Sequence, residues 1–395
     1  MADPVPDRMA VGMRGVRRRA AAVLALLVVG GCTSQPPAPE PPEPSPTPTP
    51  TPSALPDATP SSSPARRLRS ITIALAGDIH FEGVLAQRLE DPARALAPTT
   101  SPLVAALAGA DVAIANLETS VGTGGRPEPG KRFTFSAGPA ALTALAGAGI
   151  DVASLANNHA LDYGRARLPS TLRAARAAAT ANPPVAVIGI GRDRDDAFRP
   201  AFTDVDGTVV ATVAATVADR DPTADRTGQW AATADLGGTA DALDPAYLLA
   251  AVRRADRDAD VVVAYLHWGV QGQGCPSVDQ RSLADRLVRA GADVVAGTHA
   301  HQLQGDGRLG RGYVAYGLGN FAWYSPGTGV TSRTGVLTLD VRPRFQRAGR
   351  ARVTQAEWRF GVIGDDGLPA PADNEVVAAI RADQQRLRGC AGLAG

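Results

Sequence analysis

The chain has five histidines in 395 residues, and all five lie in short polar clusters. The clusters follow apolar runs such as 71–75 and 261–265, which have the composition of buried strands. Imidazole, carboxylate and amide oxygen hold borderline divalent metals, and open α/β sheets place their sites at the carboxyl ends of strands. The histidines therefore predict a metal-centred site. The clusters are Gly77-Asp78-Ile79-His80, Asn157-Asn158-His159, His267-Trp268-Gly269 and Thr298-His299-Ala300-His301.

The number of candidate ligands indicates two metal ions. Asp78 and His80 are two residues apart at a strand end, so both can turn to one ion where the chain leaves the extended state. Asn116 and Glu118 follow the next predicted strand and add an amide and a carboxylate at the same edge. Together with the other histidines, these groups exceed the needs of one four-coordinate ion. Two ions about 3.5–4 Å apart, bridged by a carboxylate and a water, would use them.

The segments around these clusters predict the sheet that positions them. Between about residues 68 and 365, short runs rich in Val, Ala and Ile alternate with Ala/Leu/Arg segments of helical period, which implies an α/β domain with parallel strands and helices on its outer faces. The last strands have no helix between them and predict an antiparallel flank, and residues 366–395 are expected to form a C-terminal helix and tail. Strands are expected at 71–76, 112–115, 152–155, 185–190, 208–215, 261–266, 293–296, 313–317, 335–341 and 352–361. Helices are expected at 83–91, 101–109, 139–148, 165–178, 245–256, 277–290 and 374–388.

Residues 1–32 have the layout of a lipoprotein signal peptide. The basic stretch 14–19 precedes the apolar run 20–29, and small residues then lead to Cys32. The apolar run is short for a bilayer span, and Val29-Gly30-Gly31-Cys32 resembles a bacterial lipobox, in which the cysteine is acylated. The alternative is an ordinary signal peptide with a chance cysteine. We expect export and a lipid anchor at Cys32 on the outer face of the bacterial cell membrane.

Residues 33–67 are predicted to be a disordered linker. They are mostly Pro, Ser, Thr, Ala and Glu, with alternating Pro and Thr at 46–52. Proline at this density excludes helix and central strand and favours an extended spacer that cannot build a core. After a lipidated cysteine, such a spacer would hold a globular domain away from the membrane. A tail with no such purpose would have the same composition.

The net charge bears on which partners the protein binds, and the cysteine content bears on whether it forms a disulfide. Forty basic residues balance thirty-nine acidic ones, so bulk electrostatics give no reason to expect nucleic acid as a partner. Beyond Cys32, only Cys275 and Cys390 remain. In an oxidising exterior this pair can form a disulfide that holds the C-terminal helix near the segment after His267. The alternative for Cys275 is a role as a metal ligand.

Six motifs resemble, in the same order along the chain, those of bacterial capsule synthesis proteins of the CapA type. The resemblance covers roughly residues 71–362. It implies the four-layer α/β/β/α sandwich of the calcineurin-like metallophosphoesterases and an association with poly-γ-glutamate capsule synthesis or export. The motifs are Gly77-Asp78, Asn116-Leu117-Glu118, Leu155-Ala156-Asn157-Asn158-His159-Ala160-Leu161-Asp162-Tyr163-Gly164, His267-Trp268-Gly269, Gly297-Thr298-His299-Ala300-His301-Gln302-Leu303-Gln304 and Tyr316-Gly317-Leu318-Gly319-Asn320-Phe321.

The metallophosphoesterase scheme, carried over by this resemblance, implies two divalent ions, Mn, Fe or Zn, and a role for each motif residue. Glu118 would take the bridging position that is usually an Asp, and His159 would face the leaving oxygen as proton donor or transition-state stabiliser, with Asp162 orienting its ring. Asp162 could instead cap the helix that follows. The first metal would take Asp78, His80 and His301, and the second Asn158, His267 and His299.

Several positions depart from the family pattern. Gln271 stands where the His-Trp-Gly motif usually continues to Glu, and Ala300 replaces the usual Pro, but neither change removes a proposed ligand. The longer arm of Glu118 would weaken the bridge and the second metal. His80 is retained where many relatives have Met, so this chain keeps a fuller ligand set.

The segment Lys131-Arg132-Phe133-Thr134-Phe135 places two cations beside aromatic rings between two motifs. Folded over the metals, Lys131 and Arg132, together with Asn116, would bind an anionic substrate such as a phosphate or a polyanionic chain. A solvated loop is the alternative reading of the same residues. Asn157 is expected to be a turn or capping residue.

Three functional hypotheses follow. The first is a lipid-anchored surface protein of the CapA type that acts in poly-γ-glutamate or related capsule polymer biosynthesis or export, with a binuclear metal hydrolase site. Its partners would be the capsule polymer or another anionic substrate, the membrane through its anchor, and a capsule synthase or export complex. The second is a non-catalytic polymer-binding or export accessory, and the third a general secreted metal-dependent phosphoesterase.

Overall fold

The computed structural model describes residues 69–325, 327–345 and 349–393. The predicted signal peptide, Cys32 and the predicted linker lie outside these residues, so they remain sequence-based expectations. The described residues belong to one of the two units into which the chain divides, Pro64–Gly395. None of its described helices is long and apolar enough to cross a membrane.

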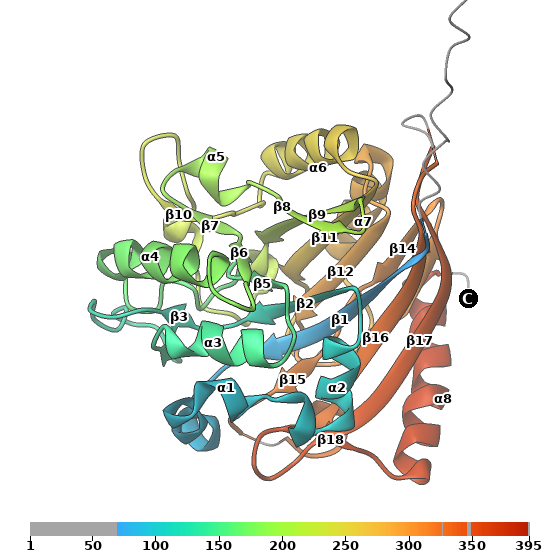
Figure 1. Ribbon diagram of the computed structural model, residues 1–395, viewed down its shortest axis with the longest axis horizontal. Coiled ribbons are helices and arrows are strands. Elements are labelled where there is room, and N and C mark those ends of the chain that lie inside the picture. Colours follow the sequence, from blue (N-terminus) through green and yellow to red (C-terminus); the bar gives the residue numbers. More distant parts are fainter. Residues whose placement is uncertain (1–68, 326, 346–348, 394–395) are drawn as a thin grey trace, which may run out of the picture. The chain divides into compact units, whose positions relative to one another are not determined.

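Within the described residues, eight strands form the first sheet. They are β1 (Ile71–Ile79), β2 (Val112–Leu117), β5 (Val152–Ser154), β6 (Ala186–Ile188), β15 (Asn320–Ala322), β16 (Arg333–Arg342), β17 (Arg352–Ile363) and β18 (Pro369–Pro371). Their order is β18, β17, β16, β1, β2, β5, β6, and β15 pairs with the end of β1 (Figure 1). Neighbours from β1 to β6 are parallel, whereas β16, β17 and β18 are antiparallel to their neighbours, which confirms the predicted antiparallel flank.

The second sheet has six described strands in the order β13, β14, β12, β11, β9, β8. Their bounds are β8 Ala201–Val205, β9 Thr208–Thr216, β11 Val261–Trp268, β12 Val294–His299, β13 Asp306–Leu309 and β14 Gly312–Ala315. The inner four strands are parallel. The edge strands β8 and β13, which the sequence did not predict, pair antiparallel with their neighbours through tight turns. At one of these turns Asp206 and Gly207 have φ values of 49° and 88°, as a two-residue hairpin requires.

The two sheets pack face to face through alternating side chains. In β1, Ile71, Ile73 and Leu75 join a core cluster with residues of the second sheet, whereas Ala74 and Ala76 face the other way. β11 alternates in the same manner, with Val261, Val263 and Tyr265 between the sheets and its intervening residues outside. Because side chains alternate along a strand, each strand is buried on both faces and reads as a continuous apolar run.

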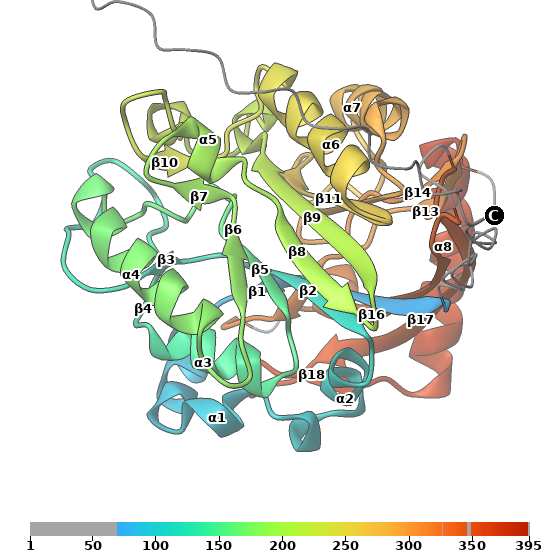
Figure 2. The ribbon, with the colours of Figure 1, turned by 45° about the horizontal axis from the view of Figure 1, so that its top comes forward.

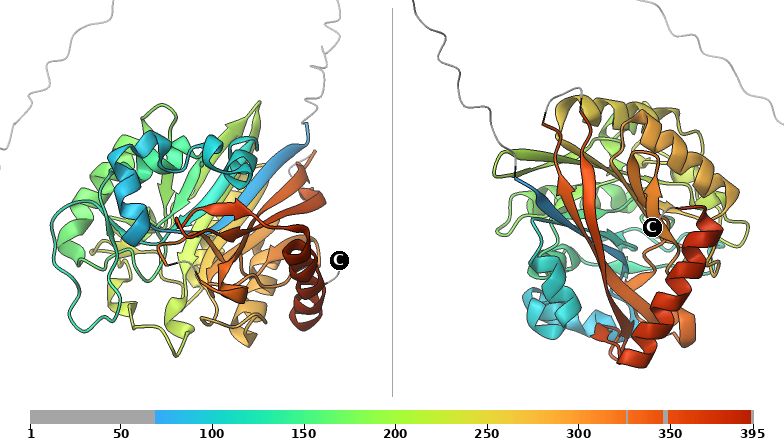
Figure 3. Two further views of the ribbon diagram at one scale, coloured as in Figure 1. Left: turned by 90° about the horizontal axis from the view of Figure 1, so that it is seen from below. Right: turned by 90° about the vertical axis from the view of Figure 1, so that its right-hand side faces the viewer.

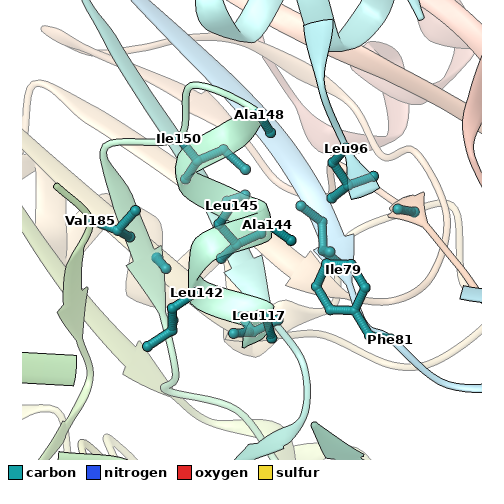
Figure 4. Close-up of a cluster of buried hydrophobic side chains, with 14 of the residues drawn as sticks. Ile79, Phe81, Leu96, Leu117, Leu142, Ala144, Leu145, Ala148, Ile150 and Val185 are labelled. Atoms are coloured by element: carbon teal, nitrogen blue, oxygen red, sulfur yellow. The ribbon is translucent and has the colours of Figure 1, made fainter. Parts of the chain in front are cut away.

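Helices cover the outer face of each sheet. Helices α1 (Pro92–Ala95), α2 (Pro102–Ala108), α3 (Ala140–Gly147) and α4 (Leu168–Ala179) pack on the first sheet, and α5 (Arg194–Ala197), α6 (Ala246–Asp258) and α7 (Val278–Ala290) on the second (Figures 1 and 2). Figure 4 shows the contact at α3, where Leu142 and Leu145 lie beside Leu117 of β2. Four layers in the order α/β/β/α result, as in the calcineurin-like metallophosphoesterase fold, and the predicted fold class is confirmed.

Local signals explain where two of the long helices begin. Ser277 and Gln280 form a capping box at the start of α7, in which each side chain satisfies a backbone N–H of the first turn. Asp373 caps α8 (Asn374–Ala391) through the backbone N–H of Val376. Asp162 does not cap a helix in this way, because the nearest helical turns start at Arg165 and Leu168.

The C-terminal helix α8 lies against the strands β17 and β13 (Figure 3). A disulfide joins Cys390 of this helix to Cys275, and their Cα atoms are 5.8 Å apart. Arg388 adds hydrogen bonds to the carboxylate and main-chain carbonyl of Asp306. The expected disulfide is therefore present, and it removes Cys275 from the candidate metal ligands.

Two strand boundaries differ from the expected ones for identifiable reasons. β1 continues to Ile79 rather than ending at residue 76, because β15 supplies it with a new partner at Asp78, whose N–H bonds to the Gly319 carbonyl at 3.0 Å. The single strand expected at 185–190 is divided at Gly189, whose φ of 84° turns the chain between β6 and β7 (Ile190–Gly191).

The remaining described elements are short. Two-stranded ladders join β3 (Ser120–Val121) to β4 (Ser136–Ala137), and β7 to β10 (Gly238–Thr239). The described 3₁₀ helices are η1 (Gly83–Glu90), which lies where the sequence predicted a helix at 83–91, and the shorter η2 (Pro98–Thr100), η3 (Arg165–Arg167), η4 (Ala218–Arg220), η5 (Gly228–Trp230) and η6 (Gly329–Ser332).

Candidate metal centre

The carboxyl ends of parallel strands from both sheets meet at one site. Asp78 lies near the end of β1 and Glu118 directly follows β2 in the first sheet, while His267 and His299 lie at the ends of β11 and β12 in the second. All four are buried with at most 1% of their surface exposed. A hydrogen bond of 2.5 Å from the Tyr265 hydroxyl to the Ala76 carbonyl joins the two sheets beside this site. The sheet edges therefore deliver ligands from sequence-distant motifs to one place.

Two groups of potential ligand atoms share one carboxylate. Asp78, Glu118 and His301 form the first group, and Glu118, His267 and His299 the second, with ligand atoms that lie within 4.8 Å of one another in each group. No other such group of His, Cys, Asp and Glu occurs among the residues that the structure describes. Sharing of Glu118 matches the bridging position that the resemblance implies for it.

The Glu118 carboxylate accepts no hydrogen bond. Both of its carboxylate oxygens are buried without a hydrogen bond. Burial, followed by the charge of Asp78, raises the pKa of Glu118 well above its ordinary value. A buried carboxylate without partners costs several kcal/mol, so it is normally retained only where a ligand completes it. Two divalent cations between these groups would supply the missing partners, and the donor set therefore fits them.

The second group includes the Asn158 amide as the sequence predicts. His267 Nε2 lies 2.7 Å from Asn158 Oδ1, 3.1 Å from His299 Nδ1 and 3.5 Å from Glu118 Oε1. Two imidazole nitrogens, an amide oxygen and a carboxylate oxygen thus converge. This mixture of nitrogen and oxygen donors is typical of sites for Zn, Mn and Fe.

Each ligand histidine is oriented through one ring nitrogen. His267 Nδ1 lies 2.9 Å from the Thr298 hydroxyl, His299 Nε2 lies 3.1 Å from Asp221 Oδ2, and His301 Nδ1 lies 2.8 Å from Asn320 Oδ1. Such outer partners fix the ring and the tautomer that a metal meets. His267 Nε2 and His299 Nδ1 are therefore the nitrogens left for metal in the second group, whereas His301 Nδ1 lies near both Asn320 and, at 3.5 Å, Asp78 Oδ2 of the first group.

Asp221 was not predicted from the sequence. It follows η4, just beyond β9, and its side chain is fully buried. Besides His299, it accepts hydrogen bonds from the backbone of Thr223 and Gln271. Burial would raise the pKa of Asp221, but these hydrogen bonds, with that to His299 the largest, lower it below the ordinary value. The available signal was an acidic residue after a predicted strand, at the same edge as the histidines.

The backbone at two ligands adopts an uncommon conformation. His299 and His301 have φ values of 85° and 53°, in the left-handed region that non-glycine residues rarely occupy. Such backbone costs about 1–3 kcal/mol and persists where surrounding structure imposes it, often at functional sites. Here the turn brings His299 to the second ligand group and His301 to the first.

Burial leaves two of the histidines uncharged. It lowers the pKa of His267 to about 3 and that of His299 to about 4, although the hydrogen bond to Asp221 acts in the opposite direction on His299. Metals bind neutral imidazole, so these two rings need no deprotonation before binding. Burial likewise acts to lower the pKa of His301, but the charge of Glu118 and its interactions with Asp78 raise it to about 9.

Asp78 is held ionised despite complete burial. Burial alone would raise its pKa, but the hydrogen bond from His301 and the charges of His267 and His301 outweigh this effect and lower it. The amide of Asn116 donates to Asp78 Oδ1 at 2.7 Å. Asn116 therefore orients a ligand and is itself buried, rather than binding substrate as the sequence suggested.

His80 is not part of either ligand group. Its backbone N–H bonds to the Ala322 carbonyl, and its ring stacks on Phe135 at a centroid distance of 4.6 Å. Trp323 and Tyr324 pack edge-on against the same ring, at 4.1 and 4.6 Å. Both ring nitrogens are buried without a partner. The structure thus does not place His80 in the first ligand group as the resemblance implied, because its ring packs among Phe135, Trp323 and Tyr324.

His159 and Asp162 form the pair that the resemblance implies. His159 Nδ1 lies 2.7 Å from Asp162 Oδ2, which leaves Nε2 directed at the metal groups, 3.8 Å from Glu118 Oε1. Burial lowers the pKa of His159 well below its ordinary value, and burial raises that of Asp162 to about 7. Asn157 stabilises this turn through bonds to Asn116, Leu117 and the His159 N–H, as expected for a turn residue.

Lys131 and Arg132 point in opposite directions. The Lys131 side chain is 4% exposed and its ammonium bonds to Asp162 and to the Asn158 carbonyl, so it is not free to receive a substrate. The Arg132 guanidinium faces solvent and pairs with Asp225 at 2.8 Å. The predicted anion-binding role of the two residues therefore lacks a free cation, because both charges have protein partners.

Comparison with known proteins identifies the family. Residues 72–325 match the family model described as "Bacterial capsule synthesis protein PGA_cap". The chain is 32% identical over 200 residues to the "Capsule biosynthesis protein CapA" of Bacillus anthracis, which covers 49% of this chain and 45% of that protein. It is 32% identical over 174 residues to the "PGA biosynthesis protein CapA" of Bacillus subtilis (strain 168), covering 44% and 42%. The chain thus spans about half the length of the curated relatives it matches.

More distant similarities extend to solved structures. One is a phosphatase from Mycoplasma pneumoniae, with a TM-score of 0.43, 12% identity and coverage of 74% of this chain and 94% of that one. Another is the 5'-nucleotidase of Candida albicans SC5314, with a TM-score of 0.39, 10% identity and coverage of 82% and 60%. At these scores the fold assignment rests on the layers and strand order described above. From its sequence match over more than half of its length, the chain belongs to the PGA_cap family of bacterial capsule synthesis proteins.

Proposed function

We propose that this protein is a metal-dependent hydrolase acting in the biosynthesis or export of poly-γ-glutamate or a related capsule polymer. Membership of the PGA_cap family and the names of the CapA relatives support the capsule role. The observation that carries the chemistry is Glu118, a fully buried carboxylate without partners that is shared by two groups of ligands. Two divalent ions, Mn, Fe or Zn, would complete it.

The candidate ligands would hold the metals, and His159 would act on the leaving group. When bound, two such ions lower the pKa of coordinated water and so supply a nucleophile near neutral pH. His267 and His299 would hold the second ion with Asn158, Asp78 and His301 would hold the first, and Glu118 would be shared by both. The ring of His159 is fixed by Asp162 at Nδ1, so that Nε2 would face the leaving group and there transfer a proton or stabilise the charge that develops. The bond cut would be a phosphoester or an amide.

The test is the metal content of the full-length protein, purified without chelators or a histidine tag and measured by plasma mass spectrometry. We expect about two equivalents of Mn, Fe or Zn in the native protein. The His299→Ala variant should lose the metal of the second group and retain that of the first. A folded protein that takes up no metal after reconstitution would refute the binuclear site.

A second measurement separates catalysis from metal binding. His159→Ala should keep both metals and lose hydrolysis of a phosphodiester probe or a γ-glutamyl oligomer by about 10²–10⁴-fold, which is the usual contribution of a general acid or base. Unchanged hydrolysis by this variant would contradict the proposed role of His159. Neither outcome depends on which metal is bound.

A non-catalytic accessory role is the second candidate. One relative, 29% identical over 197 residues, carries the name "Probable polyglutamine synthesis accessory protein" in Mycobacterium tuberculosis. A protein that binds metals and capsule polymer, yet hydrolyses neither probe, would favour this role.

We also propose that the protein is anchored at the outer face of the cell membrane through a lipid on Cys32. Only the sequence pattern around Val29-Gly30-Gly31-Cys32 supports this, since the segment lies outside the described residues. In the bacterial host, Cys32→Ser should abolish incorporation of labelled fatty acid and release the protein from the membrane fraction. Unaltered fatty-acid labelling of the variant would refute the anchor.

A further inference from the structure

Lys131 is the only lysine of the chain, and it reaches the metal centre from a distant loop. It lies between β3 and β4, in a segment that the Gly130 φ of 80° turns inward. Its side chain is 4% exposed. Burial of an ammonium is costly unless its hydrogen bonds are satisfied, so its partners determine what it does there.

The partners of Lys131 all belong to the turn that carries Asn158 and His159. The ammonium donates to the Asn158 carbonyl and to Asp162 Oδ1, and it lies 3.2 Å from His159 Nδ1. The other oxygen of Asp162 binds His159 and accepts from the Phe135 N–H at 2.6 Å. One lysine thus holds both ends of the segment between a proposed metal ligand and the carboxylate that orients the proposed proton donor.

The opposite side of the ammonium is closed by an aromatic ring. Trp230, which lies in η5 and is 2% exposed, places its ring centroid 4.8 Å from Lys131 Nζ. A cation over an indole face at this distance is attracted to it, by about 2 kcal/mol or more where water is excluded. Lys131 is therefore directed at the protein rather than at a ligand.

The geometry of these contacts suits a lysine. An ammonium is a compact point charge with three donors, which can serve a carbonyl and a carboxylate at once. The guanidinium of arginine is a larger planar fork, and Trp230 leaves little room for it. Arg132 provides the contrast, because its guanidinium turns outward to Asp225 and to the Thr223 carbonyl.

We propose that Lys131 is a positioning residue of the metal centre, which holds Asn158 at the second metal group and His159 towards Glu118. This inference rests on the proposed binuclear site. Without the ammonium, the Asn158 carbonyl loses its donor and Asp162 becomes a buried carboxylate that lacks its cation. The turn then relaxes, and both Asn158 Oδ1 and the His159 ring move from the positions that the metals and the leaving group require.

The test compares Lys131→Met with the matched control Arg132→Met in the full-length protein. Metal affinity is measured by titrating Mn²⁺ alone into metal-free protein. Loss of an outer partner typically lowers metal affinity by about 10–100-fold, so we expect that loss for one of two Mn²⁺ ions in Lys131→Met and none for the other. Arg132→Met should bind both ions as the native protein does.

Hydrogen exchange of the metal-free protein gives a readout that does not depend on metal. Backbone amides of residues 157–164 should exchange faster in Lys131→Met and at native rates in Arg132→Met. If Lys131→Met does not fold, Lys131→Met combined with Asp162→Asn removes the unpaired charge and is used in its place. Exchange of this segment at native rates in the lysine variant would overturn the inference.

Kinetics distinguish this role from substrate binding. With a phosphodiester probe, a positioning role predicts a fall in kcat with little change in KM, whereas an unchanged kcat with a raised KM would show that Lys131 binds the substrate and would overturn the inference. Native protein that binds no Mn²⁺ would refute the proposed function alone, since the exchange measurement still decides whether Lys131 holds the turn.

Discussion

At the scale of single residues, the metal centre depends on side chains that do not reach the metals. Three outer groups, Thr298, Asp221 and Asn320, each contact a ring nitrogen of one ligand histidine. Of these, Asp221 alone carries a charge, and its carboxylate is the one that can raise the basicity of a ligand ring. Its removal should therefore have the largest effect on metal binding among the three.

We predict that Asp221→Asn lowers the affinity for the second metal by about 10–100-fold and leaves the first unchanged. An amide can still accept from the His299 ring, but it lacks the charge that strengthens the ligand. The affinity is measured by calorimetric titration of Mn²⁺ into the metal-free protein. Asp219→Asn is the control, since Asp219 holds the same loop through Thr227 and Gly228 without touching His299. Equal losses in both variants would show that Asp221 only stabilises the loop.

The ligand types could be predicted from the sequence, whereas side-chain directions could not. Asp78, Glu118 and His299 were found because polar residues after apolar strands gather at one sheet edge. Asp221 was missed because its partner is 78 positions away in the sequence and no motif surrounds it. Lys131 and His80 were correctly expected near the site. The Lys131 side chain, however, is directed at Asp162 and the His80 ring at Phe135, and no spacing rule predicts these directions.

At the scale of elements, the parallel pairing of β15 with the end of β1 fixes the positions of the first group of candidate ligands. A Cβ on Gly77 would lie 1.9 Å from the Gly319 carbonyl oxygen, so only glycine permits this approach. The contact allows the Asp78 N–H to bond to Gly319 and brings Asn320 to His301. The two glycine motifs, 242 positions apart, therefore act as one structural unit.

Gly77→Ala is expected to separate β15 from β1. The cost should be about 1–3 kcal/mol of unfolding free energy or more, as for overpacking in a rigid interior. The first metal should be lost, because Asp78 and His301 would no longer share a position. Chemical denaturation and a Mn²⁺ titration measure the two effects. Gly138→Ala is the control, since a Cβ there meets no atom within 4 Å, and a native-like Gly77→Ala would contradict this account.

Most long elements could be predicted from the sequence, and several short ones could not. Most strands of the two central sheets were anticipated from apolar runs that are buried on both faces, and the long helices from their period. β8, β13 and β15 were missed because polar residues or glycine interrupt their three to five residues, so that no apolar run marks them. Their positions depend on turns and on partners that only the folded chain provides.

At the scale of the molecule, the sandwich places the candidate metal ligands and the buried carboxyl group of Asp293 at opposite strand ends. β12 ends at His299 in the metal centre, and Asp293 directly precedes its first residue, roughly 20 Å away along the strand. The sequence could not assign strands to one sheet or the other; the resemblance supplied that architecture, and the alternating cores confirm it. A titration at Asp293 can consequently be studied apart from the metals.

Asp293 makes the stability of the fold depend on pH. Burial raises the pKa of Asp293 to about 7, although the Val262 N–H and nearby Arg350 act against this shift. The folded state thus binds a proton between about pH 4 and 7 that the unfolded chain has lost, so the free energy of unfolding contributed by this group falls as pH rises through that window.

We therefore predict that Asp293→Asn becomes more stable relative to the native protein as pH rises from about 4 to 8, by about 3–4 kcal/mol in total, with most of the gain below pH 7. The amide oxygen can still accept the Val262 N–H while carrying no charge. Urea denaturation of both proteins at pH 4.5, 6 and 7.5, in the metal-free state, measures the difference. A difference that is the same at all three pH values would mean that Asp293 does not titrate in this range. Because the site lies at the opposite strand end, Mn²⁺ affinity at pH 7.5 should be unchanged by the substitution.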